Sequence, residues 1–200
     1  MEIFNVGNNA VNLYLLKTAT HLLLIDSGFP GTLHDLGREL RKTNIKIREI
    51  DFLVVTHFHP DHAGLIQDLK NESIKFVILD FQVPFVSKME QEKERLLKVR
   101  KYTPLIQKDN ICISLHESRK FLNELSIQGE IIATKGHSED GIALVLDSGQ
   151  AFVGDLLQEN MAIEMNDQNS ISDWKNLRKL GVNTVFPSHY GPYELEVNSE

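Results

Sequence analysis

The sequence has 200 residues, of which 42% are hydrophobic, and its formal net charge is −7 with the histidines counted as neutral. This length and apolar content are sufficient for a sizeable core, so we expect residues 1–200 to form a single domain. The acidic balance lacks the basic footprint of a nucleic-acid-binding protein, and no apolar run approaches the roughly 18 residues that a membrane span needs. We therefore expect neither a nucleic acid nor a membrane as a partner.

Cysteine usage and the N-terminal residues both indicate the cytoplasm. Cys112 is the single cysteine, so the chain has no disulfide framework, which fits a reducing compartment. It lies in an apolar run, and we expect it to be buried. Residues 1–5 lack the basic stretch followed by an apolar one that is typical of a secretory signal. We expect a cytoplasmic protein.

Short apolar runs predict several strands in the first half of the chain. The expected strands lie at residues 11–16, 22–25, 52–55 and 74–79. Residues 32–41 are typical of a helix, because Leu33, Leu36 and Leu40 recur on one face at helical spacing. Strands that alternate with helices in this way predict a mixed α/β class.

The segment that follows the strand expected at 52–55 carries the strongest chemical signal. His57, His59, Asp61 and His62 stand within six consecutive positions. Side chains two apart in an extended segment share a face, so His57 and His59 can reach one ion. Asp61 and His62 lie where the chain turns into a helix and can address a neighbouring ion. Imidazole and carboxylate without thiolate suit zinc, iron or manganese.

The region from residue 84 to about residue 125 is the hardest to interpret. Residues 88–95 are almost all charged or polar, with Leu96, Leu97 and Val99 behind them, which predicts a charged helix with one apolar edge. A solvated scaffold helix is the simplest interpretation. The alternative is a segment that takes part in substrate selection or in a dimer contact, so the sequence leaves a homodimer open.

The second half repeats the alternation of strands and helices. The expected strands lie at residues 130–133, 142–146, 151–153 and 182–186. An apolar stripe at helical spacing predicts a helix between the last two strands, formed by Ile171, Trp174, Leu177 and Leu180. Trp174 is expected in the core. Ser170 with Asp173 three residues later matches a capping-box pattern at the start of this helix.

Three more potential metal ligands each follow an apolar run in the second half: His137, Asp155 and His189. Together with the four ligands of the first half, they are enough for two metal ions. The remaining histidines stand alone in the sequence and are expected to be ordinary surface or core residues: His21, His34 and His116.

These residues resemble the metallo-β-lactamase-fold hydrolases, whose pattern H-x-H-x-D-H is matched letter for letter by His57 to His62. The resemblance covers almost the whole chain, since Asp26-Ser27-Gly28 upstream and the three later ligands follow in the family's order. It implies an αββα sandwich of two mixed sheets with outer helices. It also implies a first metal held by His57, His59 and His137, a second held by Asp61, His62 and His189, and Asp155 between the two. Asp26 would brace the ligand loop without touching metal.

Two departures narrow the resemblance within this superfamily. The antibiotic-cleaving lactamases commonly have a cysteine where Asp155 stands and often lack a histidine at position 62, so the chain is more similar to the glyoxalase II and lactonase branch. The flavin-linked diiron reductases usually have a glutamate where His59 stands, which argues against an oxygen-reducing diiron centre.

The activity that the resemblance implies is that of a dinuclear metal-dependent hydrolase acting on a small molecule. Two divalent ions, zinc first and manganese or iron as alternatives, would hold a bridging hydroxide that attacks a small ester, thioester or lactone. Asp61 would orient the hydroxide and pass a proton to the leaving group. Tyr190 would donate a hydrogen bond to the developing oxyanion, and packing in a tight turn is an equal alternative for this residue.

Other activities of the same fold stay open at this point. An iron-dependent persulfide dioxygenase would use His57, His137 and Asp155 as a two-histidine, one-carboxylate set. A phosphodiesterase of the same fold is another alternative, and a non-catalytic binding or sensing protein that keeps the fold is a third. Metal content and a panel of substrates distinguish these alternatives.

Overall fold

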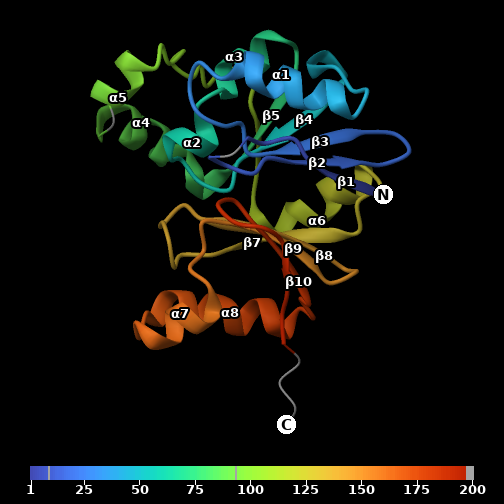
Figure 1. The fold of residues 1–200 in the computed structure, drawn as a ribbon, viewed down its shortest axis with the longest axis vertical. Coiled ribbons are helices and arrows are strands. Elements are labelled where there is room, and N and C mark those ends of the chain that lie inside the picture. The colour runs from blue at the N-terminus through green and yellow to red at the C-terminus, as the bar shows by residue number, and fades with distance from the viewer. Residues whose placement is uncertain (9, 93, 197–200) are drawn as a thin grey trace. The chain divides into compact units, whose positions relative to one another are not determined.

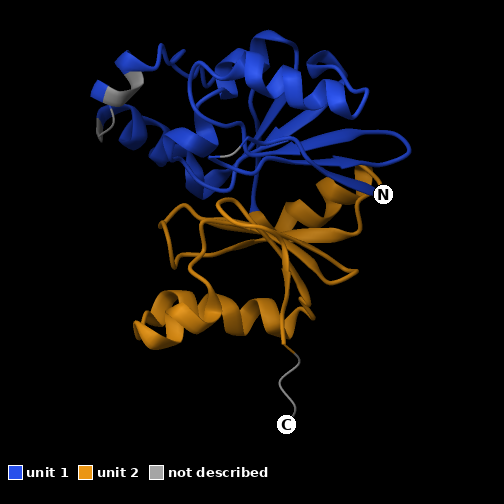
Figure 2. Ribbon diagram, viewed as in Figure 1, with its two compact units in different colours: residues 1–114 blue, residues 115–200 orange. Residues whose placement is uncertain are grey.

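The computed structural model describes residues 1–8, 10–92 and 94–196. The chain forms two compact units, Met1–Ser114 and Leu115–Glu200, each with its own sheet (Figures 1 and 2). The single domain expected from chain length stays a prediction.

The sheet of unit 1 has the strand order β1-β2-β3-β4-β5-β6. Its strands are β1 (Glu2–Asn5), β2 (Tyr14–Lys17), β3 (Leu22–Ile25), β4 (Phe52–Val54), β5 (Lys75–Leu79) and β6 (Ile111–Ile113). The first three strands pair antiparallel, and β3 to β6 pair parallel, so the sheet is mixed. The parallel strands end at one edge of the sheet, which is where parallel sheets carry their functional loops.

Helices α1 (Leu33–Lys42) and α3 (Ile66–Asn71) cover one face of this sheet in unit 1 (Figure 1). Their buried leucines and isoleucines pack with alternate residues of the strands in one core cluster. The other helical elements of unit 1 are η1 (Ile47–Glu49), α2 (Pro60–Ala63), η2 (Asp80–Gln82), α4 (Val83–Glu92) and α5 (Glu94–Val99). The segment expected as a charged helix lies in α4 and α5, and residue 93 between them is outside the described residues.

Unit 2 has a second mixed sheet, with the order β11-β10-β9-β8-β7. Its elements are α6 (Leu115–Glu124), β7 (Gly129–Ala133), β8 (Ile142–Leu146), β9 (Gln150–Gly154), α7 (Glu159–Glu164), α8 (Gln168–Lys179), β10 (Thr184–Pro187) and β11 (Tyr193–Glu194). Helix α8 packs on one face of this sheet through Trp174 and Leu177, and α6 lies on the other face (Figure 1). Trp174 is 1% exposed, which confirms its expected place in the core.

The predicted fold class is confirmed, because the chain has two mixed sheets and several helices. The strands expected at 22–25 and 142–146 have those bounds in the structure. The prediction that Cys112 is buried is wrong: it is exposed on β6, an edge strand with partly buried residues on either side of it. Residue types in an apolar run of three do not reveal that the strand lies at an edge, where one face can remain open. Among the described residues, no helix has the length and apolar character that crossing a membrane requires.

Candidate functional site

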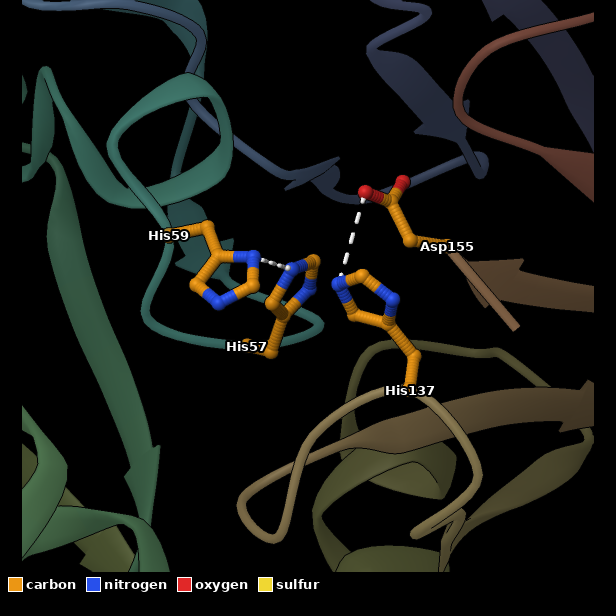
Figure 3. A group of neighbouring side chains, drawn as sticks. All are labelled: His57, His59, His137 and Asp155. Carbon is orange, nitrogen blue, oxygen red and sulfur yellow. Dashed lines mark hydrogen bonds and ion pairs between the residues drawn. The ribbon is translucent and has the colours of Figure 1, made fainter. Parts of the chain in front are cut away.

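The turn between β4 and α2 gathers four potential metal ligands in unit 1. Nε2 of His57 lies 2.9 Å from Nδ1 of His59 (Figure 3), and the His57 ring centroid is 4.1 Å from that of His62. Nε2 of His62 lies 3.4 Å from a carboxylate oxygen of Asp61. The structure therefore places all four sequence-predicted ligands of this segment next to one another.

The alternation of residue types explains why this turn presents its histidines together. Phe58, between His57 and His59, is only 4% exposed and joins the core of unit 1, with its ring centroid 6.4 Å from that of Phe76. His59 then precedes α2 as its N-cap residue, and Pro60 begins the helix, a position that proline's fixed φ suits. The Phe58 side chain anchors the turn in the core of unit 1, and the histidines on either side of it point to the opposite face of the turn.

Asp26 is a buried carboxylate that holds this turn through several hydrogen bonds. It accepts the backbone N–H of Thr56 at 2.6 Å, the hydroxyl of Thr56 at 2.9 Å and Nδ1–H of His62 at 2.9 Å. Because the Thr56 hydroxyl donates to Asp26, it accepts from Nδ1–H of His57, 3.1 Å away. One carboxylate thus fixes the tautomers of His57 and His62, and both imidazoles keep the Nε2 lone pair that a metal ion requires.

The donor set also fits a cation on chemical grounds. With Nδ1 of His62 donating to Asp26, the Nε2 atom that faces Asp61 carries a lone pair, and the carboxylate oxygen opposite carries another. Two electron-pair donors that face each other are well suited to a divalent ion between them. Nitrogen and oxygen ligands of this kind are those that zinc, iron and manganese take in proteins.

The segment after β3 holds the end of α2 in place. The Ser27 hydroxyl donates to the carbonyl of His62 at 2.7 Å and accepts the backbone N–H of Leu65 at 3.0 Å. Gly64 approaches so closely that a Cβ atom on it would lie 2.3 Å from Cδ of Pro30. Asp26 itself has a φ of 64°, the left-handed region that non-glycine residues rarely adopt. The local backbone is strained where it presents this carboxylate.

Gln82 is a positioning residue of unit 1 that the sequence analysis missed. Its fully buried side-chain amide donates to the carbonyls of Val55 and Thr56, each at 3.4 Å, and its carbonyl accepts the backbone N–H of Leu79 at 3.3 Å. It therefore ties the end of β5 to the residues directly before His57. A single glutamine 26 residues from its partner carries no periodic signal in the sequence.

The other three predicted ligands come together in unit 2. Nε2 of His189 lies 3.1 Å from Oδ2 of Asp155, and Nε2 of His137 lies 3.6 Å from the same oxygen (Figure 3). Each ligand follows one strand, β7, β9 or β10, and these three strands run in the same direction in the sheet. Their carboxyl ends therefore meet at one edge, which explains how residues far apart in the sequence converge.

The capping-box interpretation of Ser170 and Asp173 is wrong. Helix α8 begins at Gln168, and its N-cap is Asp167, whose side chain accepts the backbone N–H of Asn169. Asp173 instead accepts the backbone N–H of Gly136 at 2.7 Å, in the loop that carries His137. Capping-box letters identify a pattern of local sequence, and here a partner from a distant loop uses the carboxylate instead.

Tyr190 lies beside His189 and is partly buried. Burial raises the pKa of its phenol, the nearby Asp155 carboxylate raises it further, and a hydrogen bond with the side chain of Gln158 opposes this rise. The hydroxyl therefore stays protonated at neutral pH, as an oxyanion donor must. Its catalytic role is still a prediction.

Each of the seven predicted ligands belongs to a group of residues that could hold a metal ion: His57, His59, Asp61, His62, His137, Asp155 and His189. The three other histidines have other surroundings. His21, for example, lies next to the ring of Phe52 at 5.9 Å between centroids and close to the hydroxyl of Thr20.

Comparison with known proteins identifies the class to which this fold and these ligands belong. The profile of the Metallo-beta-lactamase superfamily matches residues 6–189, so the chain belongs to that superfamily. It is 28% identical over 189 residues to the Beta-lactamase-like protein 2 homolog of Caenorhabditis elegans, an alignment that covers 90% of this chain and 56% of that protein. It is also 28% identical over 225 residues to the "Probable metallo-hydrolase YqjP" of Bacillus subtilis (strain 168), covering 94% and 69% of the two chains. The chain thus spans little more than half the length of the first of these relatives.

Solved structures show the same fold at lower sequence identity. The metallo-beta-lactamase family protein TTHA1429 from Thermus thermophilus has a TM-score of 0.73 and 22% identity, over 92% of this chain and 70% of that one. TTHA1623, solved in a di-iron-bound form, has a TM-score of 0.67 and 18% identity, over 97% and 94% of the two chains. A likeness at this identity shows the fold alone.

Proposed function

We propose that this protein is a metal-dependent hydrolase whose seven predicted ligands hold two divalent ions. The observation that carries the proposal is the Asp26 network, because it prepares the Nε2 lone pairs of His57 and His62 for a cation. Membership of the superfamily and a relative whose printed name is a metallo-hydrolase support the same conclusion. Zinc is the preferred ion, with manganese or iron as alternatives.

The ligands divide into two sets of three and one shared residue. His57 and His59, with His137, would hold one ion, and Asp61 and His62, with His189, would hold the other. Asp155 would lie between them, since its Oδ2 atom is the neighbour of both His137 and His189.

Two side chains would take part in the chemistry beyond holding metal. A pair of divalent ions, when bound, would supply a water of lowered pKa and polarise the carbonyl oxygen of the substrate. Asp61, whose carboxylate is 18% exposed, would accept a hydrogen bond from the attacking water and deliver its proton to the leaving group. The protonated Tyr190 hydroxyl would donate to the oxyanion that develops on the substrate.

A small ester, thioester or lactone is the substrate class that we propose. The presence of Asp155, where antibiotic-cleaving lactamases commonly have a cysteine, and of His62 supports similarity to the glyoxalase II and lactonase branch. The acidic net charge favours a small carbonyl substrate over a nucleic acid. A cytoplasmic location is a further prediction of the sequence.

Metal analysis followed by a substrate panel tests the proposal. Protein purified without added metal is analysed for zinc, manganese and iron, and is then assayed with thioesters, lactones, β-lactams and phosphodiesters, with and without chelator. We expect about two ions per chain and chelator-sensitive hydrolysis of an ester, thioester or lactone. One iron per chain with oxygen uptake would replace the hydrolase by a dioxygenase, and hydrolysis that resists complete metal removal would overturn metal dependence.

A further inference from the structure

The loop that carries His137 is closed at its base by its own backbone. The backbone N–H of Thr134 donates to the carbonyl of Gly141 at 2.8 Å, and that of Gly141 donates to the carbonyl of Ser138 at 2.9 Å. His137 projects from this loop with 34% of its side chain exposed. Contacts within the loop fix its base to the sheet, so something else must set the direction of the segment that bears the imidazole.

Asp173 on α8 supplies that contact. Its Oδ2 atom accepts the backbone N–H of Gly136 at 2.7 Å. Asp173 is only 7% exposed, so this bond is sheltered from water. Hydrogen bonds from N–H groups to a buried carboxylate are short and about twice as strong as those between neutral groups.

The loop also rests directly on the helix. A Cβ atom on Gly136 would lie 2.2 Å from Oγ and 2.7 Å from Cα of Ser170, so only glycine permits this approach. The first two turns of α8 therefore determine both the distance and the direction of the loop backbone one residue before His137.

Helix α8 connects this loop to the frame of the other two ligands in unit 2. Trp174 and Leu177 of the helix pack in one core with Val153 of β9 and Val185 of β10. Asp155 follows β9, and His189 follows β10. Through the Asp173 carboxylate, the position of His137 therefore depends on the same core that positions Asp155 and His189.

We propose that Asp173 is a positioning residue for His137, and that its hydrogen bond to the backbone of Gly136 sets the metal affinity of this ligand group. The inference rests on the proposed metal centre. It assigns to Asp173 no contact with metal or substrate.

The primary test replaces Asp173 by asparagine. An amide keeps one acceptor oxygen but carries no charge, so its hydrogen bond from the Gly136 N–H should be only about half as strong as that of the carboxylate. We expect Asp173→Asn to weaken zinc binding by about tenfold, measured by competition with a chromophoric chelator, and to speed hydrogen exchange at Gly136 in the metal-free protein. Gly136→Ala, which pushes the loop off Ser170, should weaken zinc binding in the same direction.

The matched control is Asp51→Asn in unit 1. Asp51 also uses its carboxylate to accept a backbone N–H, that of Leu22 at 2.8 Å, but it precedes β4 and so lies at the opposite end of that strand from the histidines. This variant should bind zinc within about twofold of the parent, although it weakens a comparable hydrogen bond by the same loss of charge. If Asp173→Asn fails to fold, Asp173→Glu keeps the carboxylate and should bind zinc more tightly than Gly136→Ala.

The outcomes separate this inference from the proposed function. Unchanged zinc affinity and unchanged exchange at Gly136 in Asp173→Asn would overturn the positioning role. An equal loss of zinc affinity in Asp51→Asn would also overturn it, because general destabilisation would then account for the effect. A parent protein that binds zinc yet cleaves no ester, thioester or lactone would overturn the proposed function alone, and the affinity of the variants would still decide the role of Asp173.

Discussion

The two units present their metal-type ligands in different ways. In unit 1, four ligands stand within six residues, His57–His62, and a buried carboxylate already orders two of them. In unit 2, the three ligands come from three separate loops, and the His137 and His189 side chains are 34% and 40% exposed. The compact motif is part of the core of its unit, whereas the dispersed ligands depend on what holds each loop. Substitutions in the compact motif of unit 1 should therefore lower both stability and metal affinity. Substitutions of the dispersed ligands in unit 2 should lower metal affinity alone.

The largest expected contrast is between His62→Ala and His189→Ala. His62→Ala should lower the free energy of unfolding of the metal-free protein by about 3 kcal/mol, because it empties a fully buried site and removes a donor to Asp26. His189→Ala should change it by less than about 0.5 kcal/mol, as for an exposed residue. Both should reduce ester hydrolysis at least about a hundredfold. Urea unfolding followed by circular dichroism measures the difference, and equal stability losses would contradict the comparison.

A second contrast concerns the carboxylate behind the compact motif. Asp26→Asn should weaken zinc binding by about 10–100-fold and destabilise the metal-free protein by about 1–3 kcal/mol, because an amide cannot accept from both Thr56 and His62. The control is Asp68→Asn, which alters a carboxylate that accepts the Thr103 hydroxyl at 2.8 Å. Calorimetric zinc titration and thermal unfolding should show little change in that control. Parent-like zinc affinity in Asp26→Asn would show that the tautomers are fixed in another way.

A smaller effect is expected from the buried glutamine at the end of β5. Gln82→Met preserves most of the volume but removes the donors to Val55 and Thr56, so stability should fall by about 1 kcal/mol and zinc affinity by several-fold. Gln67→Met, on α3, breaks comparable bonds with Asn71 and Ile106. It should lose similar stability and keep its zinc affinity. If both variants bind zinc equally, Gln82 only stabilises unit 1.

The smallest effect is a pH dependence at the start of α8. The Ser170 hydroxyl and two backbone N–H groups lower the pKa of Asp167 below its ordinary value. A carboxyl whose pKa is lower in the folded state stabilises the fold above its unfolded pKa of about 4, and this contribution is lost as the pH falls through the folded value. The melting temperature of Asp167→Asn should therefore lie below that of the parent near pH 7 and approach it near pH 3. Zinc affinity should not change, in contrast to Asp173→Asn, and a constant difference in melting temperature across this range would contradict the assignment.

Local sequence signals predicted the features that depend on neighbouring residues. The strands at 22–25 and 142–146 and the ligand run His57–His62 each follow from residue types a few positions apart. Local signals alone predicted only a mixed α/β class. The superfamily and its two mixed sheets were predicted from the resemblance of the ligand order to that of a known family.

Long-range contacts explain what the sequence did not reveal. Asp173 accepts a hydrogen bond from a backbone N–H group 37 residues away in the sequence, and Gln82 donates one to a carbonyl 26 residues away. Neither residue therefore belongs to a local sequence pattern that would identify it. One signal for Asp173 was present, since it shares a helical face with Ser170, Trp174 and Leu177, and a carboxylate on a buried stripe needs a partner. The exposure of Cys112 depends on the place of β6 in the sheet, which three apolar letters cannot define.

The left-handed backbone at Asp26 has a consequence for protein engineering. At a φ of 64°, a design procedure that scores backbone propensity alone would replace this aspartate by glycine, which adopts such angles without strain. The replacement would remove the carboxylate that orients two imidazoles. It would thus gain stability at the expense of activity, as often happens at active sites. Mutant libraries designed to raise the stability of this protein should therefore leave Asp26 unchanged.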